Sequence, residues 1–347
     1  SGYGSSDANE TLGFFDVYVF RYSFVADHFQ YVSAMSLIAL AAAGLARLSR
    51  RVPSRAALAV GVLLPAALGV KSWREAFEYR SAEIHYRSIL MENPGCFLAY
   101  NNLGLHRLEA GRIPEAIELF ENGLKHKASS AELNHNLGNA LVRAGRIADA
   151  IPRFEAALDA RPSFAEAANN LGNALRSLGR NSEAIFHFER AIASRSPFPE
   201  AEMNLGAALT DAGRPAEAIP HFERAIAIRP GFAEAENAFG VALAALGRTR
   251  EALTRYESAL ALEPGYVEAE VNLGSLLLSL GRSGEAIRRF ERALALKPGH
   301  PEAENGLGAT LATLGRADEA IAHFEAALDA RPAYATAERN LGNLLAR

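Results

Sequence analysis

Apolar side chains recur along this chain with two nested periods. The shorter period is helical: Leu171, Leu175 and Leu178 fall on one face of a helix with about 3.6 residues per turn. The longer period is 34 residues, marked by a Leu-Gly or Phe-Gly pair that returns without insertion or deletion at 103, 137, 171, 205, 239, 273, 307 and 341. A fixed period of this length predicts a stack of similar helical repeats in which each repeat contacts only its neighbours.

Each repeat divides into two helical segments. A Gly-Arg pair follows the first segment in all seven full repeats, which begin at 97, 131, 165, 199, 233, 267 and 301. Glycine at this point indicates a helix end, because it adopts the left-handed conformation without a Cβ clash. The second segment places Ala184, Ile185 and Phe188 on one apolar face, and a proline such as Pro162 closes it. The pattern therefore predicts pairs of antiparallel helices.

Small residues predict where these helices approach most closely. Gly172 and Ala184 mark the close contact, and we expect Phe188 to fill the space toward the next repeat. This spacing of Leu, Gly, Ala, Phe, Ala and Pro resembles the tetratricopeptide repeat over residues 97–347. The first copy departs most, with Arg107, Gly123 and Ala128 where the pattern has leucine, alanine and proline. The resemblance implies an all-α, right-handed superhelical solenoid, with seven repeats over 97–334 and a terminal half repeat over 335–347.

The first ninety residues differ in composition. Residues 29–46 and 56–70 carry no charged side chain, and Arg47, Arg50, Arg51 and Arg55 lie between them. We interpret residues 29–70 as a hairpin of two hydrophobic, membrane-spanning helices. The alternative is a pair of buried, alanine-rich helices that cap the solenoid. For two spans, the positive-inside rule places the arginine loop in the cytoplasm, and both residues 1–28 and the repeats on the extracytoplasmic side, which is periplasmic, extracellular or lumenal.

Residues 71–96 have the pattern of a degenerate half repeat. Ala82, Tyr86 and Pro94 lie one period before Ala116, Phe120 and Ala128, in the register of a second repeat helix. There is no Gly/Ser-rich spacer here, so we expect the solenoid to continue directly from the hydrophobic hairpin.

A second resemblance rests on residues 13–45 and 71–104, GFFDVYVFRYSFVADHFQYVSAMSLIALAAAGL and KSWREAFEYRSAEIHYRSILMENPGCFLAYNNLG. They are similar to the C-terminal part of polytopic, lipid-sugar-dependent membrane O-glycosyltransferases that end in tetratricopeptide arrays. The catalytic acidic residues of that family lie in an early loop, for which this chain has no counterpart. The resemblance therefore implies topology and ancestry more than activity, with the acceptor-binding part of a longer glycosyltransferase as the alternative function.

Composition and motifs predict no catalytic, metal or cofactor site. The 36 basic and 40 acidic residues give a net charge of −4, so no basic surface for nucleic acid is indicated. Cys96 is the single cysteine, which excludes an intramolecular disulfide and a cysteine zinc site. His187, His221 and His323 occupy one repeat position and are interpreted as a solvated helix face.

Three polar residues near the start of the chain are weaker candidates. Arg21 and His28 precede the first hydrophobic stretch, where the glycosyltransferase resemblance implies contact with a lipid phosphate. The alternative is a polar collar at the membrane interface. Asn9 begins an Asn-Glu-Thr glycosylation acceptor pattern.

The strongest candidate site is a row of asparagines in the first helices. Numbered from the start of each repeat, position six holds Asn102, Asn136, Asn170, Asn204, Asn272 and Asn340, and position nine holds Asn139 and Asn173 among others. Asparagine is unfavourable inside helices, and its carboxamide can bond both groups of a peptide backbone. The row resembles the asparagine ladder of O-linked N-acetylglucosamine transferase, which implies peptide binding in a concave groove. The alternative is that these side chains bond neighbouring helices and set the register.

The asparagine row is interrupted twice, and the last repeat is incomplete. Ala238 and Gly306 break the row, so we expect peptide binding to concentrate in the first four repeats. The half repeat 335–347 has no second helix over Leu341 and Leu344, and a head-to-tail contact there would build a filament of copies. The sequence as a whole predicts a non-catalytic scaffold that binds protein or peptide segments and self-associates.

Overall fold

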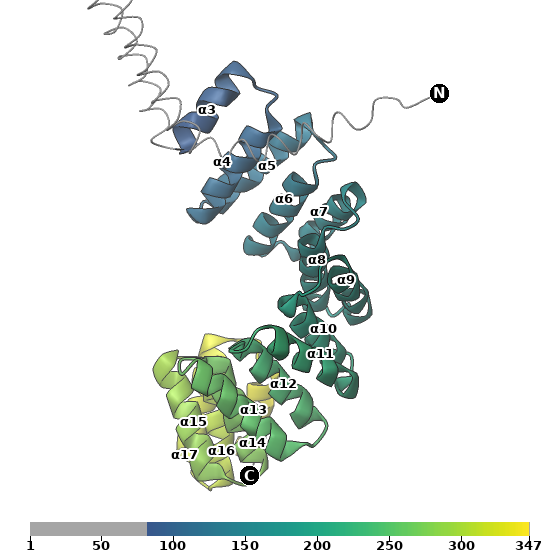
Figure 1. The fold of residues 1–347 in the computed structure, drawn as a ribbon. Coiled ribbons are helices and arrows are strands. Elements are labelled where there is room, and N and C mark those ends of the chain that lie inside the picture. The colour runs from purple at the N-terminus through teal and green to yellow at the C-terminus, as the bar shows by residue number, and fades with distance from the viewer. Residues whose placement is uncertain (1–81, 347) are drawn as a thin grey trace, which may run out of the picture. The chain divides into compact units, whose positions relative to one another are not determined.

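The computed structural model describes residues 82–346, and this part of the chain is helical without strands (Figure 1). Its helices are α3 (Ala82–Glu92), α4 (Phe97–Glu109), α5 (Ile113–His126), α6 (Ala131–Arg143), α7 (Ile147–Ala160), α8 (Ala165–Ser177), α9 (Asn181–Ser194), α10 (Pro199–Asp211), α11 (Pro215–Ile228), α12 (Ala233–Ala245), α13 (Thr249–Leu262), α14 (Val267–Ser279), α15 (Ser283–Leu296), α16 (Pro301–Thr313), α17 (Ala317–Ala330) and α18 (Ala335–Leu345). The predicted all-α solenoid is confirmed from α4 onward, with one helix pair per repeat.

The chain divides into two compact units, residues 1–88 and 89–347, and the second contains all the repeats. The expected hydrophobic hairpin 29–70, with Asn9, Arg21 and His28 before it, lies outside the described residues. Within residues 82–346, no helix has the length and apolar character that a membrane span requires.

Each first helix ends at the predicted glycine through a pair of backbone hydrogen bonds. Gly179 has a φ of +75°, which places it in the left-handed region. Its N–H donates to the carbonyl of Arg176 at 2.9 Å, and the Arg180 N–H donates to the carbonyl of Leu175 at 3.0 Å. These bonds satisfy carbonyls that the helix leaves unpaired at its end. Leu178, which the apolar period places on the buried face, is instead the residue where the helix ends and is 45% exposed.

The two helices of a repeat pack against each other around a buried aromatic ring. A Cβ built on Gly172 would lie 2.6 Å from Cε1 of Phe188, so only glycine fits against this ring. The ring also reaches the next repeat, as in the case of Phe290. A Cβ built on Gly274 would lie 2.9 Å from Cε1 of Phe290, and one built on Gly306 of the next repeat would clash with the same atom. The aromatic residue therefore packs against its own first helix as well as the next one, which adds to the predicted contact.

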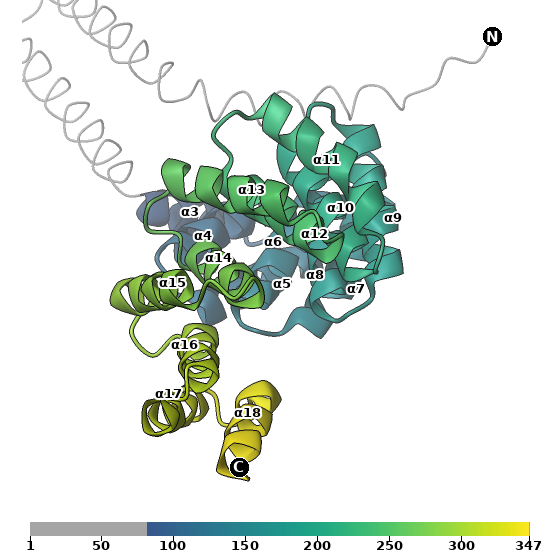
Figure 2. The same cartoon turned by 90° about the horizontal axis from the view of Figure 1, so that it is seen from below.

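The first helices lie on the inner side of the curved array. Consecutive first helices contact one another, as α10 and α12 do, whereas consecutive second helices in the described part make no contact of similar extent. A stack whose first helices approach more closely than its second helices must curve toward the first helices. Figure 2 shows this arrangement, with α6, α8, α10 and α12 inside α7, α9, α11 and α13.

Candidate functional site

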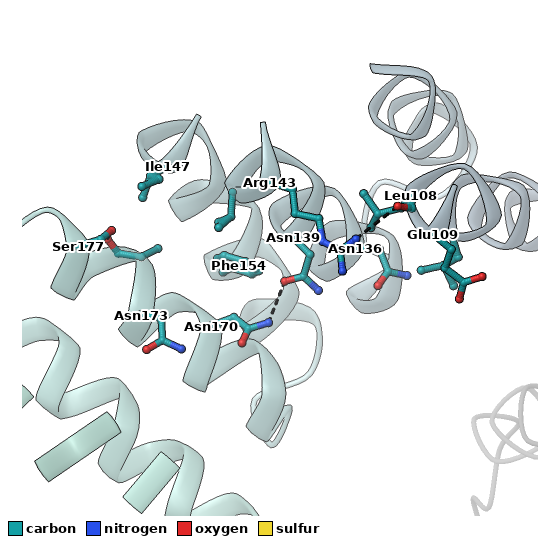
Figure 3. A pocket seen from close by; sticks show the side chains of 13 residues that line it. Leu108, Glu109, Asn136, Asn139, Arg143, Ile147, Phe154, Asn170, Asn173 and Ser177 are labelled. Atoms are coloured by element: carbon teal, nitrogen blue, oxygen red, sulfur yellow. Dashed lines mark hydrogen bonds between the residues drawn. The ribbon is translucent and has the colours of Figure 1, made fainter. Parts of the chain in front are cut away.

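A pocket of about 590 Å³ lies on the inner side of repeats 1 to 3 (Figure 3). It is lined by Leu105, Leu108, Glu109, Asn136, Asn139, Val142, Arg143, Ile147, Phe154, Asn170, Asn173, Ala174 and Ser177. All but two of these residues come from the first helices α4, α6 and α8. The structure therefore brings four of the predicted asparagines together in one hollow, and places the other four elsewhere along the row.

At alternate interfaces, asparagines at positions five and six of neighbouring repeats bond each other. The residue at position six donates through Nδ2 to Oδ1 of the residue at position five in the preceding repeat. The pairs are Asn136 to Asn101 at 2.8 Å, Asn204 to Asn169 at 3.0 Å, Asn272 to Asn237 at 3.0 Å and Asn340 to Asn305 at 3.0 Å. In the other repeats position five holds His135, Met203, Val271 or Arg339, so the pairs link repeats two by two. This is the register-setting role given above as the alternative.

One run of hydrogen bonds crosses three repeats in a single direction. Asn204 donates to Asn169, which donates to Oδ1 of Asn170 at 3.3 Å, and Asn170 donates to Oδ1 of Asn139 at 2.8 Å. The run ends where Nδ2 of Asn139 lies 3.0 Å from Nε2 of His135. An amide N–H must be matched by an acceptor, so this contact requires Nε2 to be unprotonated. Burial agrees, since it lowers the pKa of His135 to about 4.

The carboxamides differ in what they leave available to a ligand. Asn170 and Asn139 use both Nδ2 and Oδ1 within the protein. Asn102 accepts from Asn101 at 3.3 Å. Asn173 lines the pocket and makes no side-chain hydrogen bond within residues 82–346. Asn136 donates to Asn101 but receives no donor at its own oxygen from this part of the chain. Among the asparagines that line the pocket, the free groups are thus the carboxamide of Asn173 and the oxygen of Asn136.

Buried ion pairs between the two helices of a repeat were not foreseen from the sequence. Glu270 is 1% exposed and contacts Arg292 at 2.9 Å and Arg289 at 3.1 Å. Position four is glutamate in repeats 4 to 8. Together with the basic residues nineteen positions later in repeats 4 to 7, this recurrence is the signal that could have revealed the pairs. Because each carboxylate has basic partners on its own repeat, these groups fix the helix pair rather than face a ligand.

The same pairs change the interpretation of the histidine series. Nδ1 of His221 lies 2.7 Å from Oε2 of Glu202, and Nδ1 of His323 lies 2.7 Å from Oε2 of Glu304. These two side chains are partly buried partners of carboxylates, so the solvated face predicted for them is wrong. His187 has alanine at position four of its repeat, and burial lowers its pKa. The described residues contain no group of three side chains able to hold a metal ion.

The Asn169–Asn204 pair is a direct test of the register role. Asn204→Leu removes the donor to a buried amide oxygen of Asn169, and we expect it to lower the free energy of unfolding by about 1–3 kcal/mol. Replacing both asparagines by leucine removes the unpaired group and is expected to recover much of this loss. Urea denaturation of the two single variants and the double variant measures the coupling. Equal and additive losses would contradict a paired role, and Asn173→Leu serves as the unpaired control.

Comparison with known proteins agrees with the repeat geometry. A family model described as tetratricopeptide repeat matches residues 74–131, 135–198, 237–301 and 271–335, and a second model of the same description matches residues 198–263. A search of curated proteins finds no match.

Several solved structures share the fold. A chain of the hetero-tetramer Cut9–Hcn1 of the APC/C aligns with a TM-score of 0.60 at 18% identity over 76% of this chain, which spans 52% of that chain. A tetratricopeptide repeat protein from Parabacteroides merdae aligns with a TM-score of 0.63 at 13% identity, over 72% of this chain and 98% of that one. PilW, a type IV pilus biogenesis factor, aligns with a TM-score of 0.55 at 22% identity, over 62% and 98%. At these identities the likeness concerns the fold, and since the family model matches more than half of the residues, the chain belongs to the tetratricopeptide-repeat family.

Proposed function

We propose that this protein is a non-catalytic interaction scaffold that binds an extended peptide segment along the inner face of its first repeats. The observation that carries the proposal is the pocket on α4, α6 and α8, which combines an apolar wall with carboxamides whose hydrogen-bonding groups are free. An extended peptide has a backbone N–H and C=O at each residue, and a carboxamide can bond both. The side chain of Asn173 offers both groups, and Asn136 offers its oxygen.

The inner face also favours binding through its rigidity. Asn139 and Asn170 are held by hydrogen bonds from two repeats, so their orientation is fixed before a ligand arrives. A prearranged surface loses less conformational entropy on binding than a mobile one. Free carbonyl lone pairs on these locked amides can still accept from a peptide N–H, because a carbonyl oxygen has two acceptor sites. The row predicted from the sequence thus has two roles in the proposal, register and recognition.

The test starts from a library of random 12-residue peptides displayed on phage and selected against the full chain. The selected peptide is then synthesised and titrated by fluorescence anisotropy. We expect Asn173→Ala to weaken binding about five-fold, because one amide contact contributes roughly 1 kcal/mol. The double variant Asn136→Ala/Asn173→Ala is expected to weaken it more than ten-fold. Asn340→Ala, which changes the same residue type at the far end of the row, is the matched control and should leave the affinity within two-fold.

Two outcomes contradict the proposal. One is a selection that yields no peptide with specific affinity for the full chain. The other is an unchanged affinity in the double variant, which would leave the asparagine row with its structural role alone. Circular dichroism of each variant separates a lost contact from a lost fold.

Membrane attachment through residues 29–70 stays part of the proposal. It is supported by the uncharged stretches 29–46 and 56–70 and by the arginine-rich loop between them. Residues 97–347 are expected to resist protease added from the cytoplasmic side, and digestion only after cytoplasmic access would overturn the orientation. Self-association into filaments and the role as part of a longer O-glycosyltransferase stay predictions of the sequence.

A further inference from the structure

Two arginines on neighbouring first helices differ in whether the protein neutralises their charge. Arg176 in α8 donates from Nε to Oδ2 of Asp211 in α10 at 2.7 Å, so this guanidinium is already neutralised by the protein. Arg143 in α6 lines the pocket, and it has no carboxylate partner within residues 82–346. One of its Nη1–H groups donates to the carbonyl oxygen of Leu108 at 3.3 Å (Figure 3).

This contact orients the Arg143 guanidinium and occupies only one of its N–H donors. Leu108 lies near the C-terminal end of α4, where the helix dipole is negative and attracts a cation. A guanidinium has five N–H donors, so the remaining ones are free toward the pocket. Arg143 is therefore held at one corner and presents a charged donor group near Asn136 of the same helix, with Asn173 of α8 on the opposite side of the pocket (Figure 3).

From this arrangement we propose that the pocket selects a peptide with an acidic side chain, which binds the Arg143 guanidinium while the peptide backbone bonds the asparagines. The inference rests on the proposed peptide-binding function and names the chemistry of its ligand. A carboxylate matches the planar guanidinium with two parallel N–H···O bonds, which is the strongest of the side-chain pairings. Leu105, Leu108 and Val142 line the same part of the pocket and offer apolar contact to the methylene groups of the bound acidic side chain.

A second charge in the pocket limits the number of acidic residues. Glu109 in α4 also lines the pocket, and its carboxylate makes no ion pair or hydrogen bond within the described part of the chain. A tract of several acidic residues would bring like charges together at Glu109, which is unfavourable. The pocket therefore fits one aspartate or glutamate within an otherwise uncharged segment, rather than a polyacidic tail.

The experiment uses the same 12-residue phage library, selected in parallel against the wild-type chain and against two charge variants. We expect aspartate or glutamate to be enriched at least three-fold over the input library at one position of the wild-type binders. In Arg143→Glu, that position is expected to favour lysine or arginine instead. Arg288→Glu makes the same charge change on α15, outside the pocket, and should keep the wild-type preference.

Identical residue preferences in the wild type and in Arg143→Glu would overturn the inference. So would binders enriched in polyacidic tracts, because these conflict with the charge of Glu109. Failure of the proposed function gives a different result, since no specific binder emerges or the binders ignore Asn136 and Asn173. If Arg143→Glu proves unfolded by circular dichroism, Arg143→Met is used in the same selection. We expect the preference for an acidic residue to be lost in this variant, and its retention would contradict the inference.

Discussion

Phe188→Ala is expected to lower the free energy of unfolding by about 3–5 kcal/mol, the range for removing a buried phenylalanine that the surroundings cannot refill. The ring of Phe188 is 0% exposed and lies against Gly172 of the facing helix. Glycine has no side chain that could move into the space, and the backbones of α8 and α9 are held by the repeats on either side. The cavity therefore stays open, and its cost adds to the lost transfer free energy. Urea denaturation followed by circular dichroism measures the change.

Phe186→Ala is the matched control for this prediction. Phe186 lies on the same helix, two residues earlier, and is 59% exposed. Its ring makes an edge contact with the ring of the adjacent His187, with 5.1 Å between the ring centroids, but a substitution at an exposed position changes stability by only roughly 0.5 kcal/mol. Similar losses in the two variants would contradict the packing argument. Because each repeat contacts only its neighbours, amide hydrogen exchange should increase first in α8 and α9 of the Phe188 variant and least in α16 and α17.

The helix pairs could be predicted from the sequence because each of their features depends on local geometry. Gly179 marks a helix end since its φ of +75° disfavours other residues, and Phe188 faces Gly172 since a Cβ there would clash with the ring. The wrong prediction for Leu178 has a related cause. The apolar period continues one residue beyond the last helical turn, and periodicity alone cannot show that the helix has already ended.

The site could be predicted less completely, because its contacts depend on how repeats stack. The sequence indicates where the asparagine row lies, but it does not indicate the bonding. A bond from Asn204 to Asn169 joins residues 35 apart, so it appears only when one repeat is laid on the next. The alternation of asparagine at position five carries the signal, although a carboxamide in a sequence does not say which partner it bonds. Arg143 could not be identified from the sequence for the same reason: only the structure shows that no carboxylate within residues 82–346 forms an ion pair with it.

His135 gives the second large effect, a loss of stability on mild acidification. Burial lowers the pKa of its imidazole to about 4, whereas an unfolded histidine titrates near 6.5. The unfolded chain therefore takes up a proton first as the pH falls, and protonation of His135 in the folded state is opposed by burial and by the amide N–H that Asn139 directs at Nε2. Stability is thus full above about pH 6.5, falls between pH 6.5 and 4, and loses about 3 kcal/mol in total through this residue.

His135→Met isolates that contribution, because methionine already occupies the equivalent position five at Met203 and cannot titrate. Urea denaturation at pH 7.5 and pH 4.5 is expected to show a smaller difference in the variant than in the wild type, by about 2–3 kcal/mol. His187 adds in the same direction, since burial lowers its pKa as well, so the variant keeps part of the dependence. An identical pH dependence in both proteins would contradict a neutral, buried His135. That result would also mean that Nε2 of His135 is not the acceptor at which the hydrogen-bond run from Asn204 ends. Asn139 and Asn170 would then lack the fixed orientation on which the prearranged pocket depends.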